Sequence, residues 1–174
     1  MNRARIGTLC KFAGVACALM TLILVVFLLS GSFESERKPQ RITCINNLKQ
    51  IGIAFRIWEG DHGDQYPFNV STNADDTMEF CAVGKDGFDS NAVFHLKAMA
   101  NSEGMTSPKI LVCPQDRSKK AAPDFGSLGP ANITYRFRSG PNVTEANGNE
   151  VLAICPIDGN TLYCDGHVEE RKGK

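Results

Sequence analysis

Cysteine is the residue type in this chain best suited to chemistry. Seven cysteines occur among 174 residues, and five lie beyond residue 40: Cys44, Cys81, Cys113, Cys155 and Cys164. Thiols pair as disulfides in exported proteins and bind zinc as thiolates. If Gly159-Asn160 centre a hairpin turn, Cys155 and Cys164 lie opposite each other, about 4.5 Å apart at Cα and within disulfide range. If the turn is centred one residue earlier, the two cysteines are diagonal and a bridge is strained.

A second disulfide would join Cys44 to Cys113. These residues belong to a predicted helix and a predicted strand, so the bridge would tie the two elements together. Cys81 would then be free or paired with another chain. The sequence therefore predicts up to two internal bridges.

The rival interpretation of these residues is a metal site. Cys155, Cys164 and His167, with or without Cys113, offer the sulfur and nitrogen ligands that zinc prefers. The chain has no C-x-x-C pair, the usual spacing of structural zinc ligands. Disulfides are therefore the first expectation and a zinc site the alternative.

Other candidate groups are isolated in the sequence. Asp61 and Asp64 could supply oxygen ligands to calcium, but calcium needs six to eight oxygens, and a solvated turn with helix-capping acids is the preferred interpretation. His95 has no acid or cysteine in helical register and is expected to be a partly exposed helix residue. No Ser-His-Asp arrangement, phosphate-binding loop or paired-carboxylate motif occurs. The sequence predicts neither an enzyme nor a bound cofactor.

The stretch from Arg41 to Trp58 is predicted to form an amphipathic helix that packs on a sheet. Apolar residues recur every three or four positions, at Ile42, Ile45, Leu48, Ile51 and Phe55. Polar residues occupy the other face, at Asn46, Asn47, Lys49, Gln50 and Arg56. Gly52 lies within the apolar stripe at a cost of about 1 kcal/mol in helix propensity, which indicates the close approach of another backbone.

Residues 12–29 contain no charge and would form about 27 Å of helix, enough to span a bilayer. Arg3, Arg5 and Lys11 precede this run, and the first charge after it is Glu34. The positive-inside rule then places the N-terminus in the cytoplasm and the rest of the chain outside. A cleaved signal peptide is the competing interpretation, although no A-x-A site follows the run.

Three segments are expected along the chain. Residues 1–30 form a cytoplasmic tip and transmembrane helix, and 31–40 form a linker in which Pro39 interrupts helical hydrogen bonding. Residues 41–174 form the outer domain, which carries 14 Lys and Arg against 17 Asp and Glu. This slightly acidic balance offers no basic face for phosphates and argues against nucleic acid as a partner.

Alternating apolar residues and turn signals predict the outer domain's remaining elements. The predicted strands are 67–70, 78–83, 109–114, 132–138, 150–157, 161–164 and 167–169. A second helix is predicted over Asn91–Asn101, with Ser90 as its cap. Asp-Gly pairs favour hairpins, so the last strands form an antiparallel meander whose apolar face rests on the opening helix. The predicted fold class is α+β, with an N-terminal transmembrane helix and an amphipathic helix on a small antiparallel β-sheet.

Four motifs occur in a characteristic order. They are Cys44-Ile45-Asn46-Asn47-Leu48-Lys49-Gln50-Ile51-Gly52, Asp61 to Pro67, Leu111-Val112-Cys113-Pro114 and Asp165-Gly166-His167-Val168-Glu169. This set resembles the bacterial prepilin-like proteins, a type II secretion pseudopilin-like family with a C-terminal signature of His, nine residues and Asp-Gly. Cys155 stands at the position of the signature His, and the usual Phe-Thr-Leu-Ile-Glu leader is missing. The motif positions carried by the resemblance are Asn46, Asn47, Gly52, Pro67, Pro114, Asp165, Gly166 and His167.

The resemblance implies a pilin-like fold and a structural role. Such a protein would be a single-pass protein of the bacterial inner membrane with a periplasmic domain. It would be a structural or assembly subunit of a type II secretion or type IV pilus-like system, with the lipid bilayer and other pilin-like subunits, or itself, as partners. The alternative from another class is a membrane-tethered periplasmic module that binds a metal or another ligand.

Overall fold

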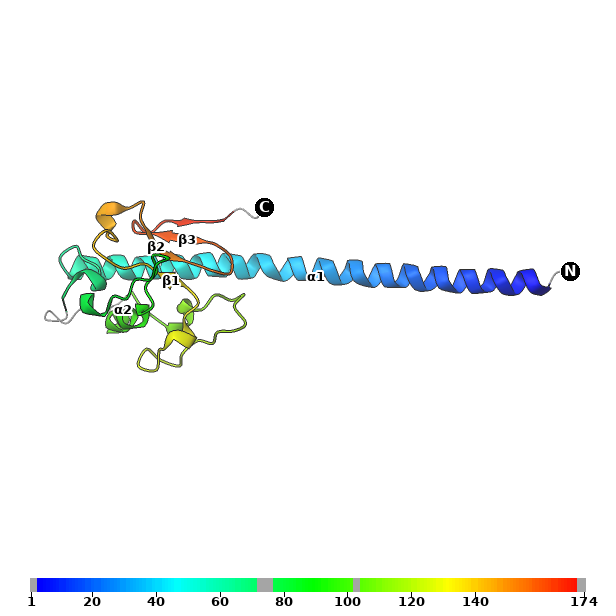
Figure 1. Ribbon diagram of the computed structural model, residues 1–174, viewed down its shortest axis with the longest axis horizontal. Helices are drawn as coiled ribbons and strands as arrows, with labels where there is room; N and C mark the ends of the chain where they lie inside the picture. The colour runs from blue at the N-terminus through cyan, green and yellow to red at the C-terminus, as the bar shows by residue number, and fades with distance from the viewer. Residues whose placement is uncertain (1–2, 72–76, 102–103, 172–174) are drawn as a thin grey trace. The chain divides into compact units, whose positions relative to one another are not determined.

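The computed structural model describes the backbone of residues 3–71, 77–101 and 104–171, and their side chains except those of 3–18, 28–36 and 101. The chain divides into two compact units, Met1–Pro39 and Gln40–Lys174. Helix α1 runs from Arg3 to Asp61 with Pro39 inside it (Figure 1). The segment predicted as a linker, 31–40, lies within this helix. The cost of about 3 kcal/mol for an interior proline is outweighed by the helical turns that continue on both sides.

The expectation of a membrane-spanning helix is corrected. In the part of the chain whose side chains the structure describes, no helix is long and apolar enough to cross a membrane. Within the predicted span, 12–29, the described side chains are those of 19–27.

The α+β class and the antiparallel meander are confirmed. The strands are β1 (Arg136–Phe137), β2 (Val151–Ile154), β3 (Thr161–Tyr163) and β4 (Val168–Glu169). They pair antiparallel in the order β1-β2-β3-β4. All four are shorter than predicted, and the register shifts between Val151 and Ala153. Gly166, with φ of 86°, supplies the left-handed residue of the turn between β3 and β4.

Three segments predicted as strands form short 3₁₀ helices instead. They are η1 (Pro67–Asn69), η3 (Met78–Phe80) and η5 (Pro108–Leu111). Proline begins η1 and η5, where its fixed φ favours a helical turn, and the Ser107 hydroxyl caps η5 by accepting from Lys109 N–H at 3.3 Å. The other 3₁₀ turns are η4 (Met99–Asn101), η6 (Pro130–Asn132) and η7 (Glu145–Asn147).

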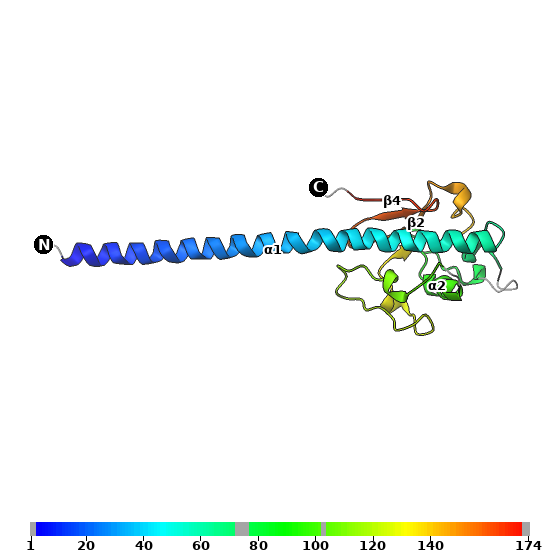
Figure 2. The same cartoon turned by 180° about the vertical axis from the view of Figure 1, so that it is seen from behind.

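The second predicted helix is present but shorter. It is α2 (Ala92–Ala98), which continues into η4, and its N-cap is Asn91 rather than Ser90. In Figures 1 and 2, strands β2–β4 lie on one side of the C-terminal part of α1, and α2 lies on the other. That part of α1 is thus covered from two sides within the Gln40–Lys174 unit.

The buried face of α1 follows the predicted stripe with two exceptions. Leu48, Ile51 and Phe55 are buried in the core. Ile42 is 59% exposed and Asn47 is buried, each opposite to the prediction. The true stripe runs through Cys44 and Leu48 rather than Ile42, because the segment that ends in Val112 and Cys113 packs at that level.

Gly52 has the close neighbour that its position predicts. A Cβ at Gly52 would lie 3.3 Å from the Cα of Gly166 and 2.9 Å from Leu162 Cδ1. The absence of a side chain therefore lets the β3–β4 turn reach the helix.

Candidate functional site

Three cysteines far apart in sequence meet in the core of the Gln40–Lys174 unit. Cys44 lies on α1, Cys113 follows η5, and Cys155 follows β2. All three are fully buried. Their sulfur atoms and a carboxylate oxygen of the half-buried Asp158 lie within 4.8 Å of one another. These four residues are called the thiol cluster below.

Backbone N–H groups point at the sulfur atoms of two of these cysteines. Asp158 N–H donates to Cys155 Sγ at 3.4 Å, and Ile157 N–H also interacts with this sulfur. Gln115 N–H acts in the same way on Cys113. Both turns have the sequence C-P-x-D, and in both the residue after the proline contributes a backbone N–H. Each turn therefore stabilises negative charge on its cysteine.

The three thiols share their protons unequally. Hydrogen bonds from Cys113 and Cys44 lower the pKa of Cys155 to about 3. The same contact with Cys155 raises the pKa of Cys113. Cys44 has its pKa raised to about 12, because its interactions with Cys155 and its burial outweigh a favourable hydrogen bond with Cys113. The shared hydrogen bonds thus favour negative charge on Cys155 over Cys44 and Cys113.

Neighbouring polar groups fix the positions of Cys44 and Cys113. Asn47 Nδ2 donates to the Val112 carbonyl at 3.1 Å and joins α1 to the segment that carries Cys113. Tyr135 O–H donates to Cys44 Sγ at 3.7 Å. The Cys113 N–H donates to Thr134 Oγ1 at 3.2 Å. The cluster is therefore held by contacts from outside it as well as within it.

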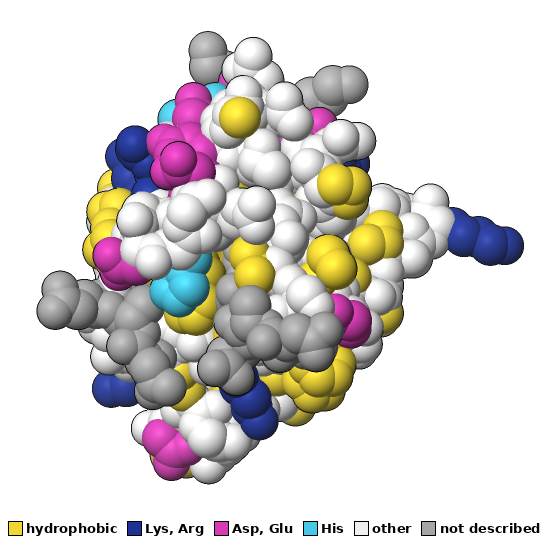
Figure 3. Space-filling model, turned by 90° about the vertical axis from the view of Figure 1, so that its left-hand side faces the viewer, with side chains coloured by type: hydrophobic (Ala, Val, Ile, Leu, Met, Phe, Trp, Pro, Cys, Tyr) yellow, Lys and Arg dark blue, Asp and Glu magenta, His cyan; other side chains and the backbone are white. Residues whose placement is uncertain are grey.

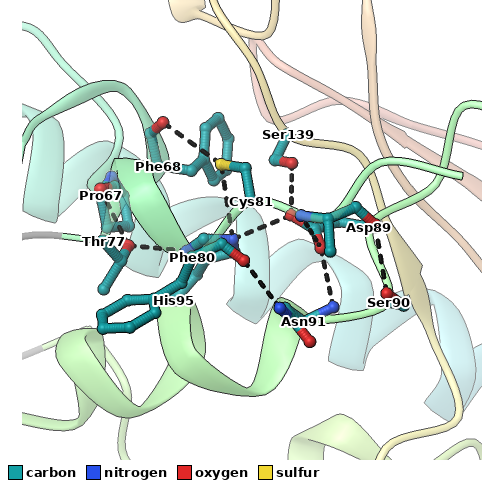
Figure 4. A network of polar contacts seen from close by, with 11 residues as sticks. Pro67, Phe68, Thr77, Phe80, Cys81, Asp89, Ser90, Asn91, His95 and Ser139 are labelled. Carbon is teal, nitrogen blue, oxygen red and sulfur yellow. Dashed lines mark hydrogen bonds and ion pairs between the residues drawn. The ribbon is translucent and has the colours of Figure 1, made fainter.

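A second cluster contains Cys81, Asp89 and His95 (Figure 4). His95 and Asp89 are buried, while Cys81 is partly exposed. His95 Nε2 lies 3.0 Å from Asp89 Oδ2 and 3.9 Å from Cys81 Sγ. The prediction of a partly exposed His95 without acid or cysteine neighbours is wrong, because the loop 77–91 folds back over α2 and brings both groups to it.

Hydrogen bonds occupy both ring nitrogens of His95. The Thr77 hydroxyl donates its proton to the Pro67 carbonyl at 2.9 Å, so Thr77 Oγ1 accepts from His95 Nδ1–H at 2.6 Å. Asp89 accepts from four groups, including the Ser139 hydroxyl and His95 Nε2. Burial would raise the pKa of Asp89, but these hydrogen bonds lower it to about 2. Thr77 and Asp89 therefore hold the buried ring of His95 through both of its nitrogens.

This second cluster is suited to structure rather than catalysis. In a cysteine nucleophile activated by histidine, the thiol and the orienting acid use different ring nitrogens. Here Cys81 and Asp89 face the same nitrogen, Nε2. Burial also raises the pKa of Cys81, which keeps it a thiol. The acceptor capacity of Asp89 is already used by protein donors, which leaves little for a metal ion.

The predicted pairing of Cys155 with Cys164 is wrong. Ile154 pairs with Thr161, so the residue opposite Cys155 in the hairpin is Asn160. Cys164 lies further along, where its N–H donates to the Glu150 carbonyl. Glu150 and Cys155 are five residue steps apart along the strand, about 16 Å, far beyond the disulfide limit of about 7 Å. The other predicted pair, Cys44 and Cys113, is brought together in the thiol cluster, with both thiols free.

The zinc ligands predicted from sequence are only partly brought together. Cys113 and Cys155 belong to the thiol cluster, but Cys164 lies at the far end of the hairpin. His167 is exposed and stacks on Tyr163, with ring centroids 4.4 Å apart. Asp61 and Asp64 are both exposed in the turn after α1.

The residues carried by the family resemblance have structural positions. Asn47 and Gly52 are buried in α1, and Pro67 begins η1 as a buried residue. Asn46, Pro114 and Asp165 are exposed, and Asp165 accepts from His167 N–H at 3.0 Å in the β3–β4 turn that Gly166 closes. The structure therefore places them in packing and turns.

Sequence reasoning missed Cys44 and Asp158 as partners of Cys155. The signal was present as the repeated C-P-x-D, at Cys113–Asp116 and at Cys155–Asp158. The aspartates of the two copies have different partners. Asp116 accepts from Thr134 Oγ1 at 2.8 Å, whereas Asp158 accepts from Cys113 Sγ at 3.5 Å.

Comparison of the chain with protein-family models, with curated proteins and with solved structures finds no match.

Proposed function

We propose that this protein is a pilin-like structural subunit, which acts by packing against other subunits of its kind. The observation that carries the proposal is the surface of α1 between residues 19 and 27. Eight large apolar side chains there are each at least half exposed: Leu19, Met20, Leu22, Ile23, Leu24, Val25, Val26 and Phe27. An apolar surface that runs around a helix is stable in water only when other molecules cover it.

The Gln40–Lys174 unit supports the same role. Its four-stranded meander and α2 enclose the C-terminal part of α1, which is how a small sheet domain can be carried on a long helix. On the face of the molecule shown in Figure 3, exposed hydrophobic side chains form separate patches among polar atoms. The resemblance of four ordered motifs to the prepilin-like family agrees with a subunit whose helix makes the contacts.

Site-specific photo-crosslinking in whole cells tests the proposal. A photoreactive residue at Met20, which is 74% exposed, is expected to give a ladder of adducts whose masses are multiples of the chain. The matched control places the same residue at Lys97, an exposed position on α2, and is expected to give little multimer. A single monomer band at Met20, or adducts with lipid alone, would contradict the proposal.

A further inference from the structure

The thiol cluster has the composition and spacing of a metal centre, and this inference does not depend on the proposed function. We propose that Cys44, Cys113, Cys155 and Asp158 bind one Zn²⁺ ion in a closed, tetrahedral site. Three sulfur ligands and one carboxylate suit a borderline-soft divalent cation, whereas calcium and magnesium require oxygen ligands.

The distances match a tetrahedral centre. With Zn–S of about 2.3 Å and Zn–O of about 2.0 Å, tetrahedral angles put sulfur atoms about 3.8 Å apart and sulfur about 3.5 Å from oxygen. Cys113 Sγ lies 3.5 Å from Asp158 Oδ2. All four ligand atoms lie within 4.8 Å of one another, so a cation at their centre requires shifts of less than about 1 Å.

The surroundings supply the outer contacts that a zinc–thiolate site needs. Backbone N–H groups of the two C-P-x-D turns face Cys113 and Cys155, and Tyr135 O–H faces Cys44. These donors stabilise thiolates, which are the form of cysteine that binds metal. When zinc binds, the cysteine thiols release their protons, and the positive charge of the cation then stabilises the thiolates that remain.

A disulfide explains the cluster less well. One bridge uses two sulfurs and leaves the third buried beside it, together with the Asp158 carboxylate that turns toward Cys113. A zinc ion uses all four groups. Since the ligands come from α1, the segment after η5 and the β2–β3 hairpin, the site fastens three separate parts of the unit to one point.

The first experiment measures metal in the full chain, purified under reducing conditions from cells supplied with zinc. Mass spectrometry of the metal content is expected to give one zinc per chain. Cys113→Ser should lose the zinc, while Cys164→Ser should keep it. This control is matched because Cys164 is an equally buried thiol outside the cluster.

Cys113→Ser removes a core residue, so a milder variant is needed if it does not fold. Asp158→Asn keeps the shape of a half-buried side chain. Competition with a chelator should show zinc binding weakened at least as much as by loss of an outer-shell partner, roughly 10–100-fold. Co²⁺ added alone to the metal-free wild-type chain should give tetrahedral absorption bands and thiolate-to-metal charge transfer, both weaker in Asp158→Asn.

Three results would overturn the proposal. The first is a folded wild-type chain without zinc that gives no thiolate–cobalt spectrum. The second is an intact mass two hydrogens lower with Cys44 linked to Cys113. The third is zinc retained equally by folded Cys113→Ser and Cys164→Ser, because the metal would then be bound elsewhere.

Discussion

Glu59, near the end of α1, is expected to make the protein less stable as the pH rises through neutrality. The residue is only 4% exposed, and Oε2 has no hydrogen-bond partner in the protein. Burial, together with the hydrogen bond and negative charge of Glu145, raises the pKa of Glu59 from 4.5 to about 7. The folded chain therefore holds this proton more tightly than the unfolded chain does.

The sign of the pH effect follows from this difference. Below about pH 4.5 Glu59 is protonated in both states, and the stability it contributes is fully present. Between 4.5 and about 7 the unfolded chain releases the proton while the folded chain keeps it, so stability falls. Above about pH 7 the loss is complete, and the difference in pKa corresponds to about 3 kcal/mol.

Glu59→Gln removes the charge while keeping the size of the side chain. Compared with the wild type, it should be more stable by about 2–3 kcal/mol at pH 8 and nearly unchanged at pH 4.5. Urea unfolding can be followed by the fluorescence of Trp58, the single tryptophan, which is buried beside it.

Asp61→Asn serves as the control, because Asp61 is an exposed acid at the same helix end. Its side chain is exposed, so its substitution should change the stability only slightly. A Glu59→Gln variant that is equally stabilised at pH 4.5 and pH 8 would refute the reasoning, since its effect would then not come from ionisation.

Three further outcomes can be measured by urea unfolding. Gly104→Ala should destabilise by about 1–3 kcal/mol, because its Cβ would lie 2.5 Å from the Ala54 Cα, whereas Gly60→Ala, with nothing within 4 Å, should gain up to about 1 kcal/mol. If the two variants changed the free energy of unfolding equally, the backbone around Gly104 would have moved to accept the added methyl group, and the prediction would be wrong. Tyr66→Phe should cost about 1–2 kcal/mol, since its O–H donates to the buried Cys164 carbonyl at 2.7 Å, and an unchanged midpoint would refute this. Free zinc at 100 times its Kd should add about 2.7 kcal/mol, and a midpoint insensitive to chelator would contradict the metal site.

Elements with strong local signals were predictable from sequence. The three- and four-residue spacing of Leu48, Ile51 and Phe55 gave the helix, and Asp-Gly pairs gave the meander. Gly52 was interpretable because an interior glycine in an apolar stripe has few reasons other than a close neighbour. These features depend on residues near each other in the chain.

Features that depend on tertiary contacts were not predictable. The register of the β2–β3 hairpin follows from a four-residue loop ending at Gly159, with φ of 73°, rather than from a two-residue turn. This hairpin register separates Cys155 from Cys164 and places Cys155 beside Cys44. The apolar run that became η5 was mispredicted for a local reason, because Pro108 and the Ser107 cap outweigh its strand propensity.

Asn47 has a consequence for how the helix is seated. Apolar side chains would bury almost as much surface if α1 were rotated slightly or displaced along its axis, since contacts between hydrocarbons have little directional preference. The amide of Asn47 bonds a single carbonyl, that of Val112, and only one angular setting of the helix satisfies it. Cys44, almost one turn earlier on the same side, is thereby aimed at Cys113. The single hydrogen bond of Asn47 thus sets the alignment between α1 and the segment that carries Cys113.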